Sequence, residues 1–111
     1  MARFLALYMG SASGAQPAQP DAATIGKGMA AWQGWMAEHS KAIVDSGGPL
    51  GKTKKASKSG VADARNAVAG YVIVEAPSHE AAAKLFLDHP HFAIFAGDSV
   101  EVMEVMPIPG Q

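Results

Sequence analysis

The sequence predicts a single α+β domain whose elements follow the order strand, helix, strand, strand, helix, strand. Two segments space their apolar residues at helical intervals, and each follows a residue that can cap a helix. The other regular segments have strand character, and the first and third of these are apolar on both faces. A chain of 111 residues is long enough for one domain with a modest core, to which we assign residues 1–111.

The first predicted element is a strand over residues 3–9, which ends at Gly10. Its aromatic and aliphatic side chains make both alternating faces apolar, so it needs cover on both sides. A strand is favoured over a signal peptide because the apolar run is short and follows only one basic residue. Residues 10–20, which are Ser, Ala, Gly, Gln and Pro, are predicted to be a flexible connection.

Asp21 is the predicted N-cap of a helix of about twenty residues that ends before Ser46. Its inward face should hold the apolar residues that lie within about 40° of one line at 100° per residue. These are Ile25, Met29, Trp32, Met36 and Ile43. Trp35 falls to one side of this face, where it would touch a neighbouring chain or close a pocket.

The second strand is predicted over residues 50–57, where three lysines make a short polar edge strand. A polar turn region over 59–69 follows, and then the clearest strand of the chain, residues 70–76. This third strand is again apolar on both faces.

Ser78 is the predicted N-cap of a second helix that runs from His79 to about Asp88. Because the residue before a proline disfavours helical geometry, His89-Pro90 should end this helix. Residues 99–106 are predicted to form the last strand.

This order favours a four-stranded antiparallel sheet with both helices on one face, which is a ferredoxin-like fold. Since two strands are apolar on both faces, the uncovered sheet face should pack on a second copy and form a dimeric α/β barrel. The composition agrees, because 49% of the residues are hydrophobic and only 17% are charged. The predicted partner is therefore a second copy of this chain.

Several motifs together resemble the YCII-related family of small ferredoxin-like proteins. They are a turn into the second strand at Gly47-Gly48-Pro49-Leu50, residues 70–76 running into Ser78-His79-Glu80-Ala81-Ala82, the His89-Pro90 pair, and the closing strand at Val100-Glu101-Val102. The resemblance implies a dimeric α/β barrel and, in some members, a His–Asp pair for acid–base chemistry on small molecules. A dehydrochlorinase-like member acts on a chlorinated hydroxyquinol. The family's first-helix histidine falls near Trp32 here, and its Asp-Pro is replaced by His89-Pro90, with Asp88 before it.

Composition excludes several classes of function. The net charge of −1 gives no electrostatic basis for binding nucleic acid or an anionic membrane. The chain has no cysteine, which excludes thiol catalysis, disulfides and zinc–thiolate sites. No phosphate-loop or dinucleotide motif occurs, so we expect no organic cofactor. No segment approaches the ~20 apolar residues of a membrane span. We expect a cytoplasmic protein.

Residues 88–98 are predicted to connect the second helix to the last strand, and they gather the most titratable groups and hold the predicted acid–base site. His91 is the candidate base or acid and Asp98 its orienting partner, with His89 as a second catalytic candidate. The alternative is that these side chains only cap a helix end and satisfy loop carbonyls. His89 and His91 with an aspartate would also suit a metal ion, but no third histidine stands at a telling spacing, and we assign no metal.

Six further residues are candidates for substrate binding. Lys52 and Lys54 share a strand face and would hold an anionic group, or else form a solvated edge. Aromatic residues would line an apolar pocket or simply belong to the core, and these are Trp32, Trp35, Phe92 and Tyr8.

Two hypotheses of function follow. The first is a small enzyme that performs lyase-type or isomerase-type acid–base chemistry on an aromatic or anionic molecule. The second is a non-catalytic dimeric module that binds a small ligand or a protein. A shared pocket for His91 and Asp98 would favour the enzyme.

Overall fold

The computed structural model describes residues 1–10 and 20–110, so most of the connection predicted over residues 10–20 lies outside the described residues. The elements are β1 (Ala2–Met9), α1 (Ala22–Glu38), β2 (Ile43–Pro49), β3 (Thr53–Ser57), β4 (Gly60–Ala64), β5 (Val68–Ala76), α2 (His79–Lys84), α3 (Pro90–Ala93) and β6 (Ser99–Glu104). Four strands form an antiparallel sheet in the order β2-β5-β1-β6, and β3 and β4 form a separate hairpin. The α+β class and the four-stranded antiparallel sheet are confirmed. The strand order is consistent with the predicted ferredoxin-like fold.

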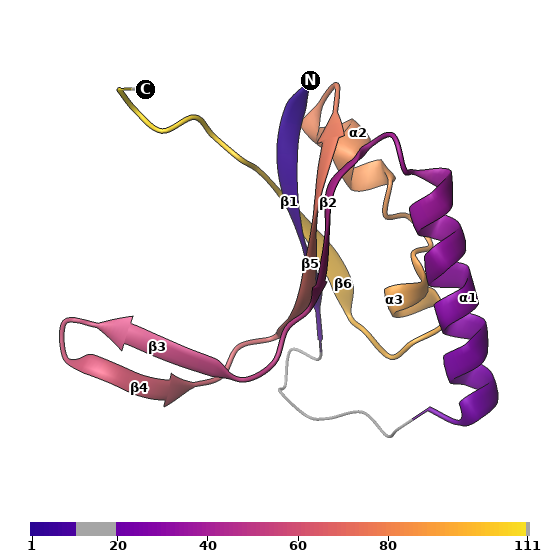
Figure 1. Ribbon diagram of the computed structural model, residues 1–111, viewed down its shortest axis with the longest axis horizontal. Helices are drawn as coiled ribbons and strands as arrows, with labels where there is room; N and C mark the ends of the chain where they lie inside the picture. Colours follow the sequence, from indigo (N-terminus) through magenta and orange to yellow (C-terminus); the bar gives the residue numbers. More distant parts are fainter. Residues whose placement is uncertain (11–19, 111) are drawn as a thin grey trace.

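The core lies between the sheet and the helices, which all cover the same face (Figure 1). Strands β1 and β5 occupy the centre of the sheet and alternate buried with half-buried residues. Phe4, Val72 and Val74 are fully buried toward the helices. Every second side chain of the two central strands therefore packs against the helices. The side chains between them point to the uncovered face of the sheet.

Helix α1 begins as predicted, because the Asp21 carboxylate accepts a hydrogen bond from the Thr24 backbone N–H at 2.7 Å. This bond lowers the pKa of Asp21. The predicted inward face is only partly correct. Trp32 and Met36 pack against the core, but Ile25 and Met29 are 41% and 49% exposed, and the fully buried residues are Gly28 and Trp35. The helix turns this side inward because Gly28 has no side chain and the Phe95 ring fills the space where a Cβ would lie.

The second strand does not lie where the sequence predicted it. Helix α1 ends at Glu38, and Ile43, expected on the helix, begins β2. The Gly47-Gly48-Pro49 motif, expected as a turn, lies inside this strand, which tolerates proline because it is at the edge of the sheet. The lysine-rich segment and part of the predicted turn region pair with each other as β3 and β4.

The second predicted helix is shorter than expected. The Ser78 hydroxyl accepts a hydrogen bond from the Ala81 N–H at 3.0 Å, which confirms the N-cap, but α2 ends at Lys84. A one-turn helix, α3, occupies part of the segment predicted as a connection. Within the described residues, no helix is long and apolar enough to cross a membrane.

Candidate functional site

The segment around Pro90 brings two histidines into the protein interior. Asp88 adopts a left-handed conformation with φ of 57°, and His89 is extended, as expected before a proline. Pro90 then starts α3, where its missing N–H and fixed φ are compatible with a first helical turn. His89 is the N-cap, because its Nδ1 accepts a hydrogen bond from the His91 backbone N–H at 3.0 Å.

The His89 imidazole lies in an aromatic box made of Tyr8, Trp32, Trp35 and Phe86. The ring centroids of Trp32 and Trp35 lie 4.6 and 4.7 Å from that of His89, and those of Tyr8 and Phe86 lie at 5.1 and 5.9 Å. His89 is 0% exposed. Burial lowers its pKa to about 4, and the nearby His91 and His39 act in the same direction. The imidazole is therefore neutral near pH 7.

The hydrogen bond at Nδ1 also fixes the tautomer of His89. An atom that accepts from a backbone N–H carries a lone pair, so the ring proton is on Nε2. This Nε2–H is buried and has no hydrogen-bond partner among the described residues. A buried donor without a partner is uncommon in proteins and needs an explanation, such as an aromatic face or a missing acceptor.

His91 is held by contacts with Met9 and Gly97 and is 8% exposed. Its Nε2 lies 2.7 Å from the Met9 carbonyl oxygen, and because a carbonyl only accepts, this Nε2 carries a proton. The Gly97 N–H donates to the His91 carbonyl at 2.9 Å, and a Cβ on Gly97 would overlap the imidazole. In the neutral ring, the lone pair is then on Nδ1.

Asp98 is not the hydrogen-bond partner that orients His91, which corrects the predicted pair. The Asp98 side chain is exposed and accepts a hydrogen bond from the Ser99 hydroxyl at 2.8 Å, while its backbone N–H donates to the Met9 carbonyl. In the described part of the chain, no hydrogen bond joins the Asp98 carboxylate to the His91 imidazole. The Met9 carbonyl at the end of β1 orients the His91 imidazole instead.

The aromatic candidates separate into a buried group and an outlier. Trp32 is half-buried and contacts Tyr8 and both histidines, with centroids 4.9 Å from Tyr8 and 6.2 Å from His91. Tyr8 is buried, which raises its pKa to about 12 and keeps its hydroxyl protonated. Phe92 is exposed, and no ring contact joins it to the box within the described residues.

Trp35 belongs to the buried core and does not lie to one side of it as expected, but it also lines a hollow beside α1, in agreement with a residue that closes a pocket. It is buried, and its Nε1–H donates to the Leu85 carbonyl at 2.9 Å. We expect Trp35→Phe to lower the free energy of unfolding by about 1–2 kcal/mol more than Trp32→Phe, because only the first leaves a carbonyl without its donor. Urea unfolding followed by circular dichroism measures both. Equal losses would contradict a stabilising role for this bond.

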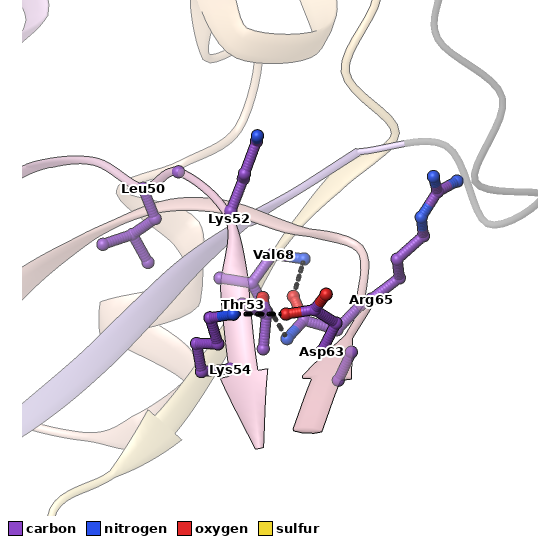
Figure 2. Close-up of a pocket in the computed structure, with 10 residues that line it drawn as sticks. Leu50, Lys52, Thr53, Lys54, Asp63, Arg65 and Val68 are labelled. Atoms are coloured by element: carbon purple, nitrogen blue, oxygen red, sulfur yellow. Dashed lines mark hydrogen bonds and ion pairs between the residues drawn. The ribbon is translucent and has the colours of Figure 1, made fainter. Parts of the chain in front are cut away.

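Lys52 and Lys54 lie apart from the histidines. They line a hollow of about 1090 Å³ at the base of the β3–β4 hairpin, with Asp63 and Arg65 (Figure 2). Lys54 is already paired with Asp63. The hairpin extends on the side of the sheet opposite α1 and α3 (Figure 1). Within one chain, these lysines therefore do not share a cleft with His89 or His91.

Sequence reasoning missed a second hollow next to the aromatic box. It has a volume of about 550 Å³ and lies between α1 and the α2–α3 segment. Trp35 and Pro90 line it, and so do four charged or titratable residues, Glu38, His39, Lys84 and Asp88. The ring centroids of Trp35 and His39 lie 5.0 Å apart. The two residues are four positions apart in the sequence, a spacing that brings side chains together on a helix, so this part of the hollow could have been found from the sequence. In the described ranges, no three His, Cys, Asp or Glu residues lie close enough to share a metal ion.

Comparison with known proteins shows a likeness in structure alone. No protein-family model matches the chain, and no curated protein matches it. Among solved structures, 5-chloro-2-hydroxyhydroquinone dehydrochlorinase (TftG) from Burkholderia phenoliruptrix, in complex with 2,5-dihydroxybenzoquinone, superposes with a TM-score of 0.56. The sequences are 16% identical, and the match covers 94% of this chain and 93% of the dehydrochlorinase. The two proteins share an overall fold along nearly their whole length.

Proposed function

We propose that this protein is a YCII-like small-molecule enzyme whose site is the aromatic box with its two histidines. The buried His89 Nε2–H without a partner carries the proposal. A neutral imidazole with this donor suits an oxygen on which negative charge gathers, such as that of a phenol, enol or quinone. The dehydrochlorinase of similar fold acts on a hydroxylated ring, which supports the same class of ligand.

The two histidines have complementary roles in the proposed chemistry. His91 keeps its Nε2 proton on the Met9 carbonyl, so its Nδ1 lone pair accepts a proton from the substrate. The His89 Nε2–H donates a hydrogen bond to the substrate oxygen. This oxygen becomes more negative as His91 removes the substrate's proton. The reaction is of lyase or isomerase type, and the substrate is a small hydroxylated aromatic or anionic molecule.

Trp32 controls access to the proposed site. It is the half-buried member of the box and contacts both histidines, so its indole separates them from solvent. A flat ring enters by displacing this indole and stacking on the remaining aromatic side chains. Trp32 stands where the resembled family has a histidine, so this enzyme uses His89 and His91 in its place.

We also propose that the active form is a homodimer joined through the uncovered sheet face. The register places Leu5 beside Ile73 and Met103, and Leu7 beside Tyr71, which makes a contiguous apolar patch at the centre of that face. Met103 is exposed and the other four are half-buried. A patch of this kind on an otherwise charged surface is typical of an interaction site.

The test of the site is a binding and turnover screen with hydroxylated benzoquinones and hydroquinones, beginning with 2,5-dihydroxybenzoquinone. We expect ligand binding to quench tryptophan fluorescence and shift the ring signals of His89 and His91 in NMR spectra. His89→Phe keeps an aromatic ring in the box but removes the donor, and should weaken binding or turnover about 10-fold to 100-fold. His79→Gln, which changes a histidine outside the box, should leave both unchanged.

The closed aromatic box supports the second candidate function, that of a non-catalytic dimeric module. His89 is fully enclosed, as in a core that only stabilises the protein. If no ring compound perturbs the fluorescence or the histidine signals, the enzyme proposal is wrong. The protein is then a non-catalytic dimeric module whose histidines hold the end of β1 against α3.

A further inference from the structure

The charged residues of this chain are strongly segregated. Residues 51–66, here called the arm, contain five Lys and Arg residues and one carboxylate, Asp63. The rest of the chain contains four Lys and Arg residues and nine Asp and Glu residues. The net charge of −1 therefore conceals a basic arm on an acidic body.

The arm projects from the protein and has little cover of its own. Its strands β3 and β4 form a two-stranded sheet that leaves the main sheet on the side opposite the helices (Figure 1). The radius of gyration is 15.6 Å, compared with about 13 Å for a compact domain of this length. Val61 on the arm is 74% exposed. An isolated hairpin is only marginally stable in water, so this arm gains stability from contact with another surface.

Most of the positive charge on the arm is available to a partner. Lys54 is paired with Asp63, and among the described residues the other four cations form no ion pair. These are Lys52, Lys55, Lys58 and Arg65. Figure 2 shows the Lys52 and Arg65 side chains extending in different directions from the base of the arm.

The uncovered sheet face carries the complementary charge at its margins. Glu101 on β6 pairs in register with Leu7, and Asp45 on β2 pairs with Ile73, so both acidic residues flank the apolar patch. The strands β2 and β6 are the two edges of the sheet. Glu75 also belongs to this face, where it is paired with Arg3.

We propose that the arm of each copy reaches over the uncovered sheet face of a second copy and pairs its cations with the carboxylates at the margins of that face. This inference rests on the proposed homodimer and adds the element that fixes how the two sheets meet. The acidic body argues for a second copy and against a nucleic acid, because nine carboxylates would repel a polyanion while they attract a basic arm. The arm is on the same side as the patch, as this contact requires (Figure 1).

The test is the dimer dissociation constant, measured by sedimentation at 50 and 500 mM NaCl. We expect it to rise about tenfold with salt, because screening weakens exposed ion pairs. At 50 mM NaCl, Lys55→Glu with Lys58→Glu should weaken the dimer about tenfold, and adding Glu101→Lys should restore part of the loss. The matched control, Lys27→Glu with Lys41→Glu, makes the same change in net charge away from the arm and should have less than about a twofold effect.

The outcomes separate this inference from the proposed dimer. A dimer that is insensitive to salt and to the arm substitutions would overturn the role of the arm and leave the sheet interface in place. A wild-type protein that sediments as a monomer at both salt concentrations would overturn the dimer and the arm contact together.

Discussion

Replacing Gly47 with alanine is expected to lower the free energy of unfolding by about 3 kcal/mol. Gly47 has φ of +62°, a left-handed conformation that costs an alanine about 1–2 kcal/mol. A Cβ at this position would also overlap the backbone carbonyl of Tyr71 on the neighbouring strand β5. Since backbone atoms cannot rotate away as a side chain does, the two strands would have to separate locally. Urea unfolding followed by circular dichroism measures the loss.

Gly48 provides the matched control for this prediction. It lies in the same strand, but its φ is not positive and a Cβ there has open space within 4 Å. Gly48→Ala should therefore change the stability by less than about 0.5 kcal/mol. Equal effects of the two substitutions would show that the irregular pairing around Asp45 and Gly48 adapts freely. The hydrogen bond from the Gly47 N–H to the Asp45 carboxylate at 2.8 Å fixes the local backbone, so we expect the pairing not to adapt freely.

The central strands were predictable because their signal is local and strong. Residues 3–9 and 70–76 were predicted as strands, and the structure has β1 at Ala2–Met9 and β5 at Val68–Ala76. Each is a run of apolar residues bounded by residues that break strands. Both N-caps were also predictable, because Asp and Ser bind their own helix within three residues.

The edge strand was misplaced because its sequence is typical of a turn. A proline is tolerated in a strand that has a neighbour on one side only, because its missing N–H can face away from the sheet, and β2 is such an edge strand. Whether a strand is central or at an edge depends on the whole sheet. Residues 50–57 were correctly predicted to contain a strand, which is β3. This strand pairs with the local strand β4 and does not belong to the main sheet.

The inward face of α1 was correct at Trp32 and Met36 and wrong in its first two turns, for a different reason. Helical spacing selects the most apolar line, which contains Ile25 and Met29. Packing instead selected the side on which Gly28 allows the Phe95 ring to approach closely. This face also buries Trp35, whose indole N–H reaches a carbonyl fifty residues away. The residue pattern of the helix alone cannot reveal a hydrogen-bond acceptor that lies so far away in the sequence.

The candidate site was predictable in its residues and not in its geometry. His89, His91, Trp32 and Tyr8 were all expected near a site, and the structure packs them together. The sequence placed the histidines on a connection between a helix and a strand, and it did not indicate that both would be buried. The group that orients His91 is the carbonyl of Met9, 82 residues away. Backbone acceptors of this kind have no sequence signature, which is why the nearby Asp98 was chosen.

Acidification from pH 7 to pH 5 is expected to remove about 2 kcal/mol of stability through His89 alone. The pKa of His89 is about 4 in the folded protein, compared with 6.5 for an ordinary histidine. Below pH 6.5 the unfolded chain binds a proton at this residue, and the folded chain does not until about pH 4. Protons therefore favour the unfolded state across this window, and stability falls as the pH falls. Urea unfolding at several pH values from 4 to 8 measures this dependence.

The variant His89→Phe isolates this contribution from that of the carboxylates and the other histidines. A phenyl ring fills the box but does not titrate, so the stability of the wild type relative to the variant should fall by about 2 kcal/mol as the pH falls from 7 to 5. The lost cap to the His91 N–H costs the variant about 1 kcal/mol at every pH. His79→Gln removes a histidine outside the box and should keep the wild-type pH dependence. If wild type and His89→Phe give parallel curves, His89 is protonated as readily in the folded protein as in the unfolded chain. Burial in the box would then not hold the imidazole in its neutral form, as the proposed chemistry requires.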